Sequence, residues 1–409
     1  MPQIVIPQVS RPLRIRLKNL FFLNILWIAF SGFSLQAQLS DKSLISIITC
    51  DAGQDLYASF GHSAFRVQDS AKGIDWVYNY GTFDFNTPNF YYKFARGKLL
   101  YSLSVSTFSD FLFTYELEKR WVKEQILKLD QEDKNALFRF LENNRKPENR
   151  DYKYDFLFDN CATKLPEILK KVLGNSLNFN GDHLKTHFTF RDLIQQNLLS
   201  NSWSSFGIDL ALGSVIDREA VVEEYMFLPK YVMLQMTNTT LDGSPFLQRE
   251  RSVLEYSDKR FSNTFGTSPL FWMLLLLLFT LTISFIDLRN GTRSRWLDFF
   301  LFLITGTAGL LIFFLWFLTD HSATANNFNI LWAFPLNVVA CYFLVGKDRI
   351  PKWMGKYILI LLVLMAITLI LWVFQIQVFS PLIAVVFATL GFRYALLYRY
   401  FTNSNNSLQ

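Results

Sequence analysis

The chain of 409 residues is poor in the side chains that build disulfide frameworks and metal sites, with three cysteines and four histidines. Three cysteines are too few for the paired framework of a small disulfide-rich domain. The net charge of +6 is not gathered into a basic stripe, and the sequence contains no nucleic-acid-binding motif. It also has no glycine-rich phosphate-binding loop, so it indicates no nucleotide cofactor.

Long apolar runs, by contrast, fill the C-terminal part of the chain. Before about residue 266 the composition is that of a globular domain with mixed charge. Each later run is long enough to cross a bilayer as a helix. The runs lie at about residues 269–286, 297–318, 328–345, 357–375 and 379–397. We therefore expect an all-α domain of five transmembrane helices at residues 267–409.

The charges between these runs predict how the chain is oriented in the membrane. The gap after the first run contains Arg289, Arg293 and Arg295, and the gap at residues 347–356 is also basic. The other two gaps contain no Lys or Arg. Because basic loops stay in the cytoplasm, the N-terminal domain should lie outside it and the C-terminus inside.

The N-terminus has the layout of an export signal. Basic residues between positions 11 and 18 precede an apolar stretch from Leu20 to Phe33, and small or polar residues continue to Ala37. This pattern predicts a signal peptide at residues 1–37, cleaved after Ala37. Leu35 is larger than the usual residue at that site, so an uncleaved signal anchor stays open. Either alternative exports the domain at residues 38–266.

The exported domain is predicted to mix strands and helices. Residues 43–49 form an apolar run typical of a buried strand, and a second strand should begin at His62. Residues 75–80 and 98–105 have the β-branched and aromatic content of two further strands. Residues 107–144 look mostly helical. The class expected is therefore α+β.

Cys161 is the best candidate nucleophile in this domain. Asp159 and Asn160 are natural helix-capping residues, and apolar side chains then recur at helical spacing over residues 165–172. Cys161 should thus lie at or just before a helix N-terminus. The helix dipole and the first amide groups lower a thiol pKa there, and these amides are expected to stabilise an oxyanion.

The other two cysteines fit packing roles better. Cys341 falls inside the third apolar run, and Cys50 follows the first predicted strand. A small buried thiol behaves as a hydrophobic side chain in such places. A disulfide between Cys50 and Cys161 stays open as a structural alternative, because the exported compartment is oxidising.

A nucleophilic cysteine needs a base, and His62 is the best histidine for this role. If Val67 pairs near residues 74–75, His62 lies opposite Asn79 or Tyr80, either of which could hold the imidazole in its working tautomer. A slip of one residue would turn the side chains to the other face of the sheet, so the choice between Asn79 and Tyr80 stays open.

The remaining histidines give weaker signals. His183 and His187 are four residues apart and could face one metal ion from a helix, but no third ligand is obvious. We therefore expect no metal site. His321 should lie in a loop at the outer membrane face, either solvated or contributing to a lipid-facing cleft.

Several short segments, in their order along the chain, carry a resemblance to a known family. In the exported domain they are Ile48–Gly53, Phe60–Ser63, Val77–Phe85, Phe94–Lys98 and Asp159–Thr163. In the apolar part they are Leu318–His321, Asn329–Trp332 and Pro335–Asn337. The first set resembles the periplasmic domain of the Lnb-type lipoprotein N-acyltransferases of Bacteroidetes. The second is similar to the five-span membrane domain of the same family.

This resemblance implies both a fold and an activity. The histidine precedes the cysteine, which resembles the circularly permuted papain-like folds of the NlpC-type and lecithin:retinol acyltransferase-like group. The family implies an enzyme of the inner membrane that moves an acyl chain from a phospholipid to the α-amine of a diacylglyceryl-cysteine lipoprotein. Cys161 would be the nucleophile and His62 the base, with no cofactor.

Two other functions are compatible with the sequence. A papain-like cysteine peptidase or amidase acting on the cell envelope would use the same order of residues, but it would not need five membrane spans. A non-catalytic membrane scaffold would keep its function after replacement of Cys161 or His62. Only the acyltransferase should produce a lysophospholipid together with the acylated lipoprotein.

Overall fold

The computed structural model describes residues 38–257, 264–346 and 351–406. Residues Leu39–Gln409 form one compact unit. The predicted signal segment, residues 1–37, lies outside the described residues.

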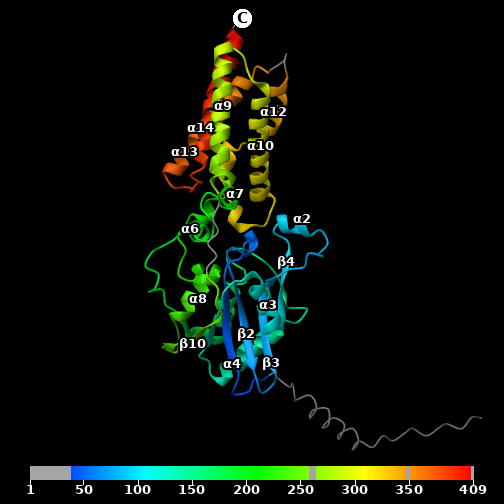
Figure 1. The fold of residues 1–409 in the computed structure, drawn as a ribbon, viewed down its shortest axis with the longest axis vertical. Helices are drawn as coiled ribbons and strands as arrows, with labels where there is room; N and C mark the ends of the chain where they lie inside the picture. Colours follow the sequence, from blue (N-terminus) through cyan, green and yellow to red (C-terminus); the bar gives the residue numbers. More distant parts are fainter. Residues whose placement is uncertain (1–37, 258–263, 347–350, 407–409) are drawn as a thin grey trace, which may run out of the picture. The chain divides into compact units, whose positions relative to one another are not determined.

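The N-terminal part is built on an antiparallel seven-stranded sheet in the order β10-β5-β1-β2-β3-β4-β6 (Figure 1). Its strands are β1 (Leu44–Cys50), β2 (His62–Asp69), β3 (Ile74–Thr82), β4 (Leu100–Thr107), β5 (Val122–Leu127), β6 (Asp151–Lys153) and β10 (Leu247–Leu254). A second sheet joins β7 (Leu177–Phe179), β8 (Thr239–Leu241) and β9 (Ser244–Pro245). The four strands expected between residues 43 and 105 are confirmed as β1 to β4.

The expectation of a mostly helical segment at residues 107–144 was wrong in its middle. This segment forms α3 (Phe108–Glu118) and α4 (Gln131–Asn144), with β5 between them. β5 carries Glu124 and Gln125, both buried. Arg66 pairs with Glu124 at 3.1 Å, and Gln125 donates to the Met233 carbonyl at 3.0 Å. Because these polar side chains find their partners only in the folded domain, the sequence of β5 does not look like that of a buried strand.

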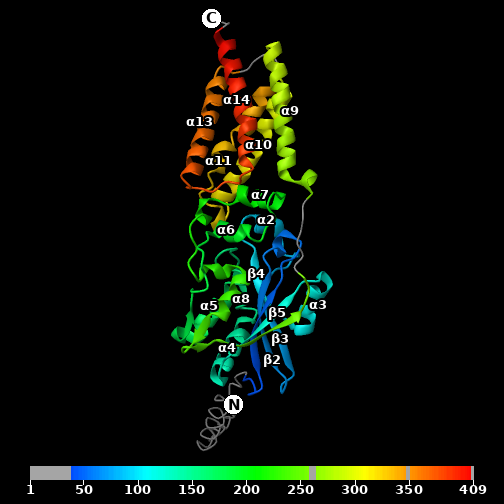
Figure 2. The same cartoon turned by 60° about the vertical axis from the view of Figure 1, so that its left-hand side comes forward.

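Helices cover both faces of the large sheet. Ile47 and Phe65 face a core completed by α4, α5 (Lys164–Leu173) and α8 (Pro229–Thr237). Ile48 and Ala64 point the other way and pack against α3. Alternate residues of a strand point to opposite faces, so each strand contributes to both cores. Figure 2 shows α3 on one side of the sheet and α5 and α8 on the other.

Three short helices complete the N-terminal part of the described chain. They are α2 (Phe90–Ala95), α6 (Phe190–Gln195) and α7 (Trp203–Ala211). Arg191 on α6 is buried and binds Asp209 at 3.0 Å and Asp217 at 2.5 Å. This ion-paired cluster fixes α6 against α7.

The C-terminal part consists of apolar helices (Figure 2). Among the described residues, the helices long and apolar enough to cross a membrane are α9 (Pro269–Asn290), α10 (Arg295–Phe317) and α13 (Met354–Val373). They correspond to the first, second and fourth predicted spans. A further helix, α14 (Ile383–Asn406), begins within the fifth predicted span and continues beyond its end.

The third predicted span, residues 328–345, is not one continuous helix. It forms α11 (Asn329–Trp332) and α12 (Asn337–Val345). The break contains Pro335, which has no N–H to donate to a helix. A Cβ placed on Gly309 of α10 would lie 2.0 Å from the Ala333 carbonyl oxygen. The glycine therefore lets α10 pack directly against the break.

Candidate active site

His62 is held in place by Asn79 from the neighbouring strand. His62 Nε2 donates a hydrogen bond to Asn79 Oδ1 at 2.6 Å. The strand register differs from the one expected, because Val67 pairs with Trp76. If the same register is continued along the strands, the residue opposite His62 is Gly81. Asn79 is two residues from Gly81, so its side chain lies on the same face of the sheet as His62. The bond to Nε2 leaves Nδ1 of the imidazole for Cys161.

Tyr80 takes no part in this arrangement. Its side chain is 1% exposed and belongs to the core on the opposite face of the sheet. Its hydroxyl donates to Asn144 Oδ1 at 3.1 Å. Of the two residues that the sequence left open beside His62, the structure brings Asn79 there and places Tyr80 elsewhere.

Cys161 lies in a turn just before α5, as its sequence indicates. The side chain of Asn160 organises this turn. Its Oδ1 accepts from the N–H of Ala162 at 2.7 Å and from that of Thr163 at 2.9 Å. Its amide donates to the Phe227 carbonyl at 2.9 Å. Two amides expected to face an oxyanion are therefore already bonded within the turn.

Gly81 lets strand β3 approach Cys161 closely. A Cβ built on Gly81 would lie 3.3 Å from Cys161 Cβ, and the φ angle of Gly81 is +89°. A side chain at this position would be strained by the backbone and crowded by the cysteine. One strand therefore supplies both the partner of His62 and the wall beside Cys161.

Cys161 and His62 interact as an acid–base pair. Burial alone would raise the pKa of Cys161, but the charge of His62, a hydrogen bond with it and the backbone N–H groups of Ser63 and Ala162 together outweigh burial, so the thiol pKa is lowered. Burial opposes the charged form of His62 as well. Its pKa is nevertheless raised by the negative charge and hydrogen bond of Cys161 and by the bond to Asn79. This pairing favours a thiolate facing an imidazolium.

Cys50 is a poor competitor for the role of nucleophile. It pairs directly with His62 in the sheet, yet it is 1% exposed and burial raises its pKa to about 12. It therefore stays a neutral thiol near pH 7. Both Cys50 and Cys161 are free, so the structure does not contain the disulfide considered as an alternative.

Tyr152 is a site residue that the sequence analysis missed. Its hydroxyl is buried and has no hydrogen-bond partner among the described residues. A Cβ built on Gly81, which would approach Cys161, would lie 3.9 Å from this hydroxyl oxygen. Burial and the charge of Cys161 both raise its pKa, so the phenol keeps its proton. No local pattern could have identified it, because β6 is three residues long and gains its place only by pairing with β4.

The segment that leads to Cys161 is bonded to the loop that follows α10. Lys153 Nζ pairs with Asp320 at 2.8 Å, and Ser322 Oγ donates to Asp155 Oδ2 at 2.6 Å. The candidate nucleophile is thus tied, through its own segment, to the end of an apolar helix long enough to span a bilayer.

Comparison with protein families identifies both parts of the chain. The Lnb N-terminal periplasmic domain matches residues 33–196, and the Lnb transmembrane domain matches residues 260–405. The chain belongs to the Lnb family. No curated protein and no solved structure matches it. As a member of this family, the chain is a membrane protein with a periplasmic domain.

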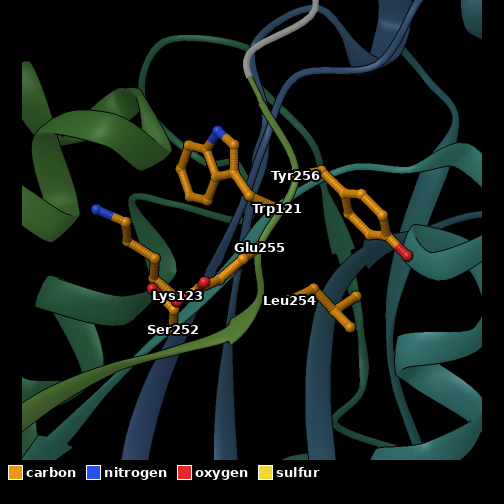
Figure 3. A pocket seen from close by; sticks show the side chains of 6 residues that line it. All are labelled: Trp121, Lys123, Ser252, Leu254, Glu255 and Tyr256. Atoms are coloured by element: carbon orange, nitrogen blue, oxygen red, sulfur yellow. The ribbon is translucent and has the colours of Figure 1, made fainter.

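His62, Asn79, Tyr152 and Cys161 all lie within the segment that matches the Lnb periplasmic domain. A pocket of about 410 Å³ lies elsewhere in this part of the molecule, beside strands β5 and β10 (Figure 3). It is lined by Trp121, Lys123, Ser252, Leu254, Glu255 and Tyr256. This pocket contains none of the four site residues.

The remaining histidines of the Lnb chain do not join Cys161. His183 and His187 lie in a loop, not on a helix. The described part of the chain contains no group of three or more side chains able to hold a metal ion. His321 lies in the loop after α10, where its Nε2 is 3.2 Å from the Phe94 carbonyl oxygen.

Proposed function

We propose that this protein is a lipoprotein N-acyltransferase of the inner membrane, with its C-terminus in the cytoplasm. The observation that carries the proposal is the Cys161–His62 pair, whose supporting segment is bonded to the end of a membrane helix. Both substrates of such a reaction are anchored in the bilayer, so a nucleophile tethered beside it meets them often and in a fixed orientation. A soluble amidase would need no such attachment.

In the first step, the Cys161 thiolate attacks an ester carbonyl of a phospholipid. The ester C–O bond breaks and a thioester forms on Sγ. The imidazolium of His62 gives its proton to the departing alkoxide, which leaves as the hydroxyl of a lysophospholipid.

In the second step, the neutral α-amine of a diacylglyceryl-cysteine attacks the thioester carbonyl. His62, now neutral, takes a proton from the attacking nitrogen. The C–S bond breaks, the amide of the N-acylated lipoprotein forms, and the Cys161 thiolate is restored beside the imidazolium. Asn79 keeps the ring oriented through both proton transfers.

Both steps place negative charge on the carbonyl oxygen. The Tyr152 hydroxyl is the donor we propose for this oxyanion, because it is buried, protonated and without another partner among the described residues. Preorganised donors aimed at developing charge are among the strongest contributions to catalysis.

The order of His62 before Cys161 supports a circularly permuted papain-like fold for this domain, which we propose as part of the same assignment.

The reaction is tested by reconstituting the chain in phospholipid vesicles with a diacylglyceryl reporter lipopeptide. We expect the lipopeptide to gain the mass of one acyl chain on its α-amine, and one lysophospholipid to form for each lipopeptide modified. Lysophospholipid without acylated peptide would indicate a phospholipase instead. Loss of peptide mass would favour the amidase.

Asn79 variants should shift the pH dependence in opposite directions. The thiolate is lost as pH falls through the lowered pKa of Cys161, and the imidazolium is lost as pH rises through the raised pKa of His62. Asn79→Ala removes an acceptor that favours the imidazolium, so the alkaline limb of kcat/KM should move to lower pH. Asn79→Asp adds a negative charge and should move this limb to higher pH.

The measurement is kcat/KM across pH, together with the rate of Cys161 alkylation by iodoacetamide. The loss of rate at the optimum in Asn79→Ala should stay below the roughly 10²–10⁴-fold that general acid–base catalysis contributes as a whole. Equal losses in both variants, with no movement of either limb, would show that Asn79 only supports the fold.

Tyr152→Phe should slow acyl transfer by roughly 10²-fold in kcat, because a single oxyanion donor contributes about that much. The rate of Cys161 alkylation should not change, since iodoacetamide forms no tetrahedral oxyanion. Tyr80→Phe is the control, because the Tyr80 ring packs against that of Tyr152 at 6.2 Å between centroids, but its hydroxyl donates to Asn144 Oδ1. A comparable effect of both substitutions on kcat would contradict the proposed role.

A further inference from the structure

Helix α2 leaves an unusual number of aromatic side chains uncovered. Tyr91, Tyr92 and Phe94 are 78%, 60% and 52% exposed, and the preceding Phe85 is 67% exposed. We call these four residues the α2 aromatic surface. Clusters of exposed apolar rings on a folded domain mark sites of contact with a partner or a membrane.

The ends of α2 and α10 are joined by hydrogen bonds. Arg96 Nε donates to the Leu318 carbonyl at 3.1 Å, and the Asp320 N–H donates to the Arg96 carbonyl at 2.9 Å. His321 Nε2 lies 3.2 Å from the Phe94 carbonyl oxygen. The contact is close-packed, because a Cβ on Gly97 would lie 3.2 Å from the backbone of Asp320 and His321.

This junction sets the height of α2 relative to the bilayer. Helix α10 has 23 residues, about 34 Å at 1.5 Å per residue, and the hydrocarbon core of a bilayer is about 30 Å thick. Leu318 follows its last residue and therefore lies at the membrane surface when α10 spans the bilayer. Because α2 is bonded to Leu318 and Asp320, its exposed rings lie at the level of the lipid headgroups.

The composition of residues 85–98 is typical of a segment that lies among lipid headgroups. Tyrosine rings concentrate at membrane–water interfaces, where the ring is buried and the hydroxyl stays hydrated. Lys93, Arg96 and Lys98 accompany the rings, and residues 85–98 contain no Asp or Glu. Basic side chains next to aromatic ones attract the phosphates of phospholipids.

Packed aromatic rings connect this surface to the candidate active site. Phe90 on α2 is buried and packs on Phe83, at 5.7 Å between ring centroids, and Phe83 contacts Tyr101 at 5.3 Å. Tyr101 stacks on Tyr154 at 4.2 Å. Tyr152, whose hydroxyl lies near Cys161, packs against the same cluster.

We propose that the α2 aromatic surface is a phospholipid-contacting surface, inserted in the headgroup layer of the outer leaflet beside the Cys161 site. It holds the domain against the membrane and presents phospholipid to the nucleophile. The presentation of an acyl donor rests on the proposed function. The contact with the bilayer does not, since it follows from the junction with α10 and from the exposed rings alone.

The contact is tested with the full chain in vesicles of phosphatidylethanolamine and phosphatidylglycerol. The photoreactive residue p-benzoylphenylalanine replaces either Tyr91 or Phe113. Phe113 is a matched control, because it is 59% exposed and lies on α3, whose buried side chains pack against the sheet. We expect a phospholipid adduct by mass spectrometry at position 91 and none at position 113. Equal yields at the two positions, or attachment to a protein at position 91, would overturn the proposal.

A second experiment tests what the contact does. The double variant Tyr91→Ser, Phe94→Ser should acylate Cys161 from vesicle phospholipid roughly tenfold more slowly, because membrane affinity scales with buried apolar area. Its acylation by the water-soluble ester p-nitrophenyl butyrate should equal that of the wild type. Phe113→Ser should change neither rate. Equal loss with both donors would overturn the role in presentation. If the wild-type chain reacts with neither donor, the proposed function is wrong. The membrane contact is then tested by the phospholipid adduct at position 91 alone.

Discussion

Replacing Cys161 by serine is expected to abolish acyl transfer, with a loss of at least about 10⁴-fold in kcat. The thiol is the group whose pKa the site lowers, and a serine hydroxyl would not be ionised by His62 at neutral pH. The measurement is the mass of the reporter lipopeptide and the amount of lysophospholipid released. Neither product should form, and the wild-type thioester on Cys161 should be missing from the intact-protein mass.

Cys50→Ser is the matched control for this experiment. Cys50 faces the same histidine across the sheet, but its pKa is raised to about 12 and its side chain is almost fully buried. This variant should keep the wild-type rate within a few-fold, allowing for a modest loss of stability. Full activity of Cys161→Ser, or inactivity of Cys50→Ser alone in a folded protein, would refute Cys161 as the nucleophile. Activity in both variants would instead favour the function of a non-catalytic membrane scaffold.

Replacing Arg393 by methionine should destabilise the helical domain by about 3–5 kcal/mol, the usual cost of leaving buried charges without their partner. Arg393 is fully buried on α14. It binds Asp298 at 2.6 Å and Asp287 at 2.7 Å, and so connects α14 to α10 and α9. Without it two carboxylates share one remaining cation, Arg293, which lies 3.0 Å from Asp298.

The stability of the helical domain is best measured by denaturant titration in detergent micelles, following helical circular dichroism. Arg399→Met is the control, because it removes a cation from the same helix at an exposed position. It should leave the midpoint nearly unchanged. Adding Asp287→Asn to Arg393→Met should recover part of the loss, because Asp298 then keeps its ion pair with Arg293 and position 287 no longer carries a charge. Equal effects of Arg393→Met and Arg399→Met would contradict a structural role for the buried charges.

Local patterns were sufficient for much of this protein. A membrane span depends on some twenty consecutive apolar residues, so α9, α10 and α13 could be located from composition alone. Strands β1 to β4 could be recognised from their apolar and β-branched content. The positions of Cys161 before a helix and of His62 at the start of a strand follow from capping residues and turns within a few positions of each.

Contacts between distant segments decided the rest. The register of β2 on β3 selects Asn79 over Tyr80, and one residue of slip would reverse the choice. Tyr152 reaches the site only because β6 pairs with β4. Strand β5 was not recognised in the sequence because two of its buried residues, Glu124 and Gln125, are polar. In each case the deciding energy is a pairing or a packing contact between residues far apart in the chain, which composition and periodicity do not encode.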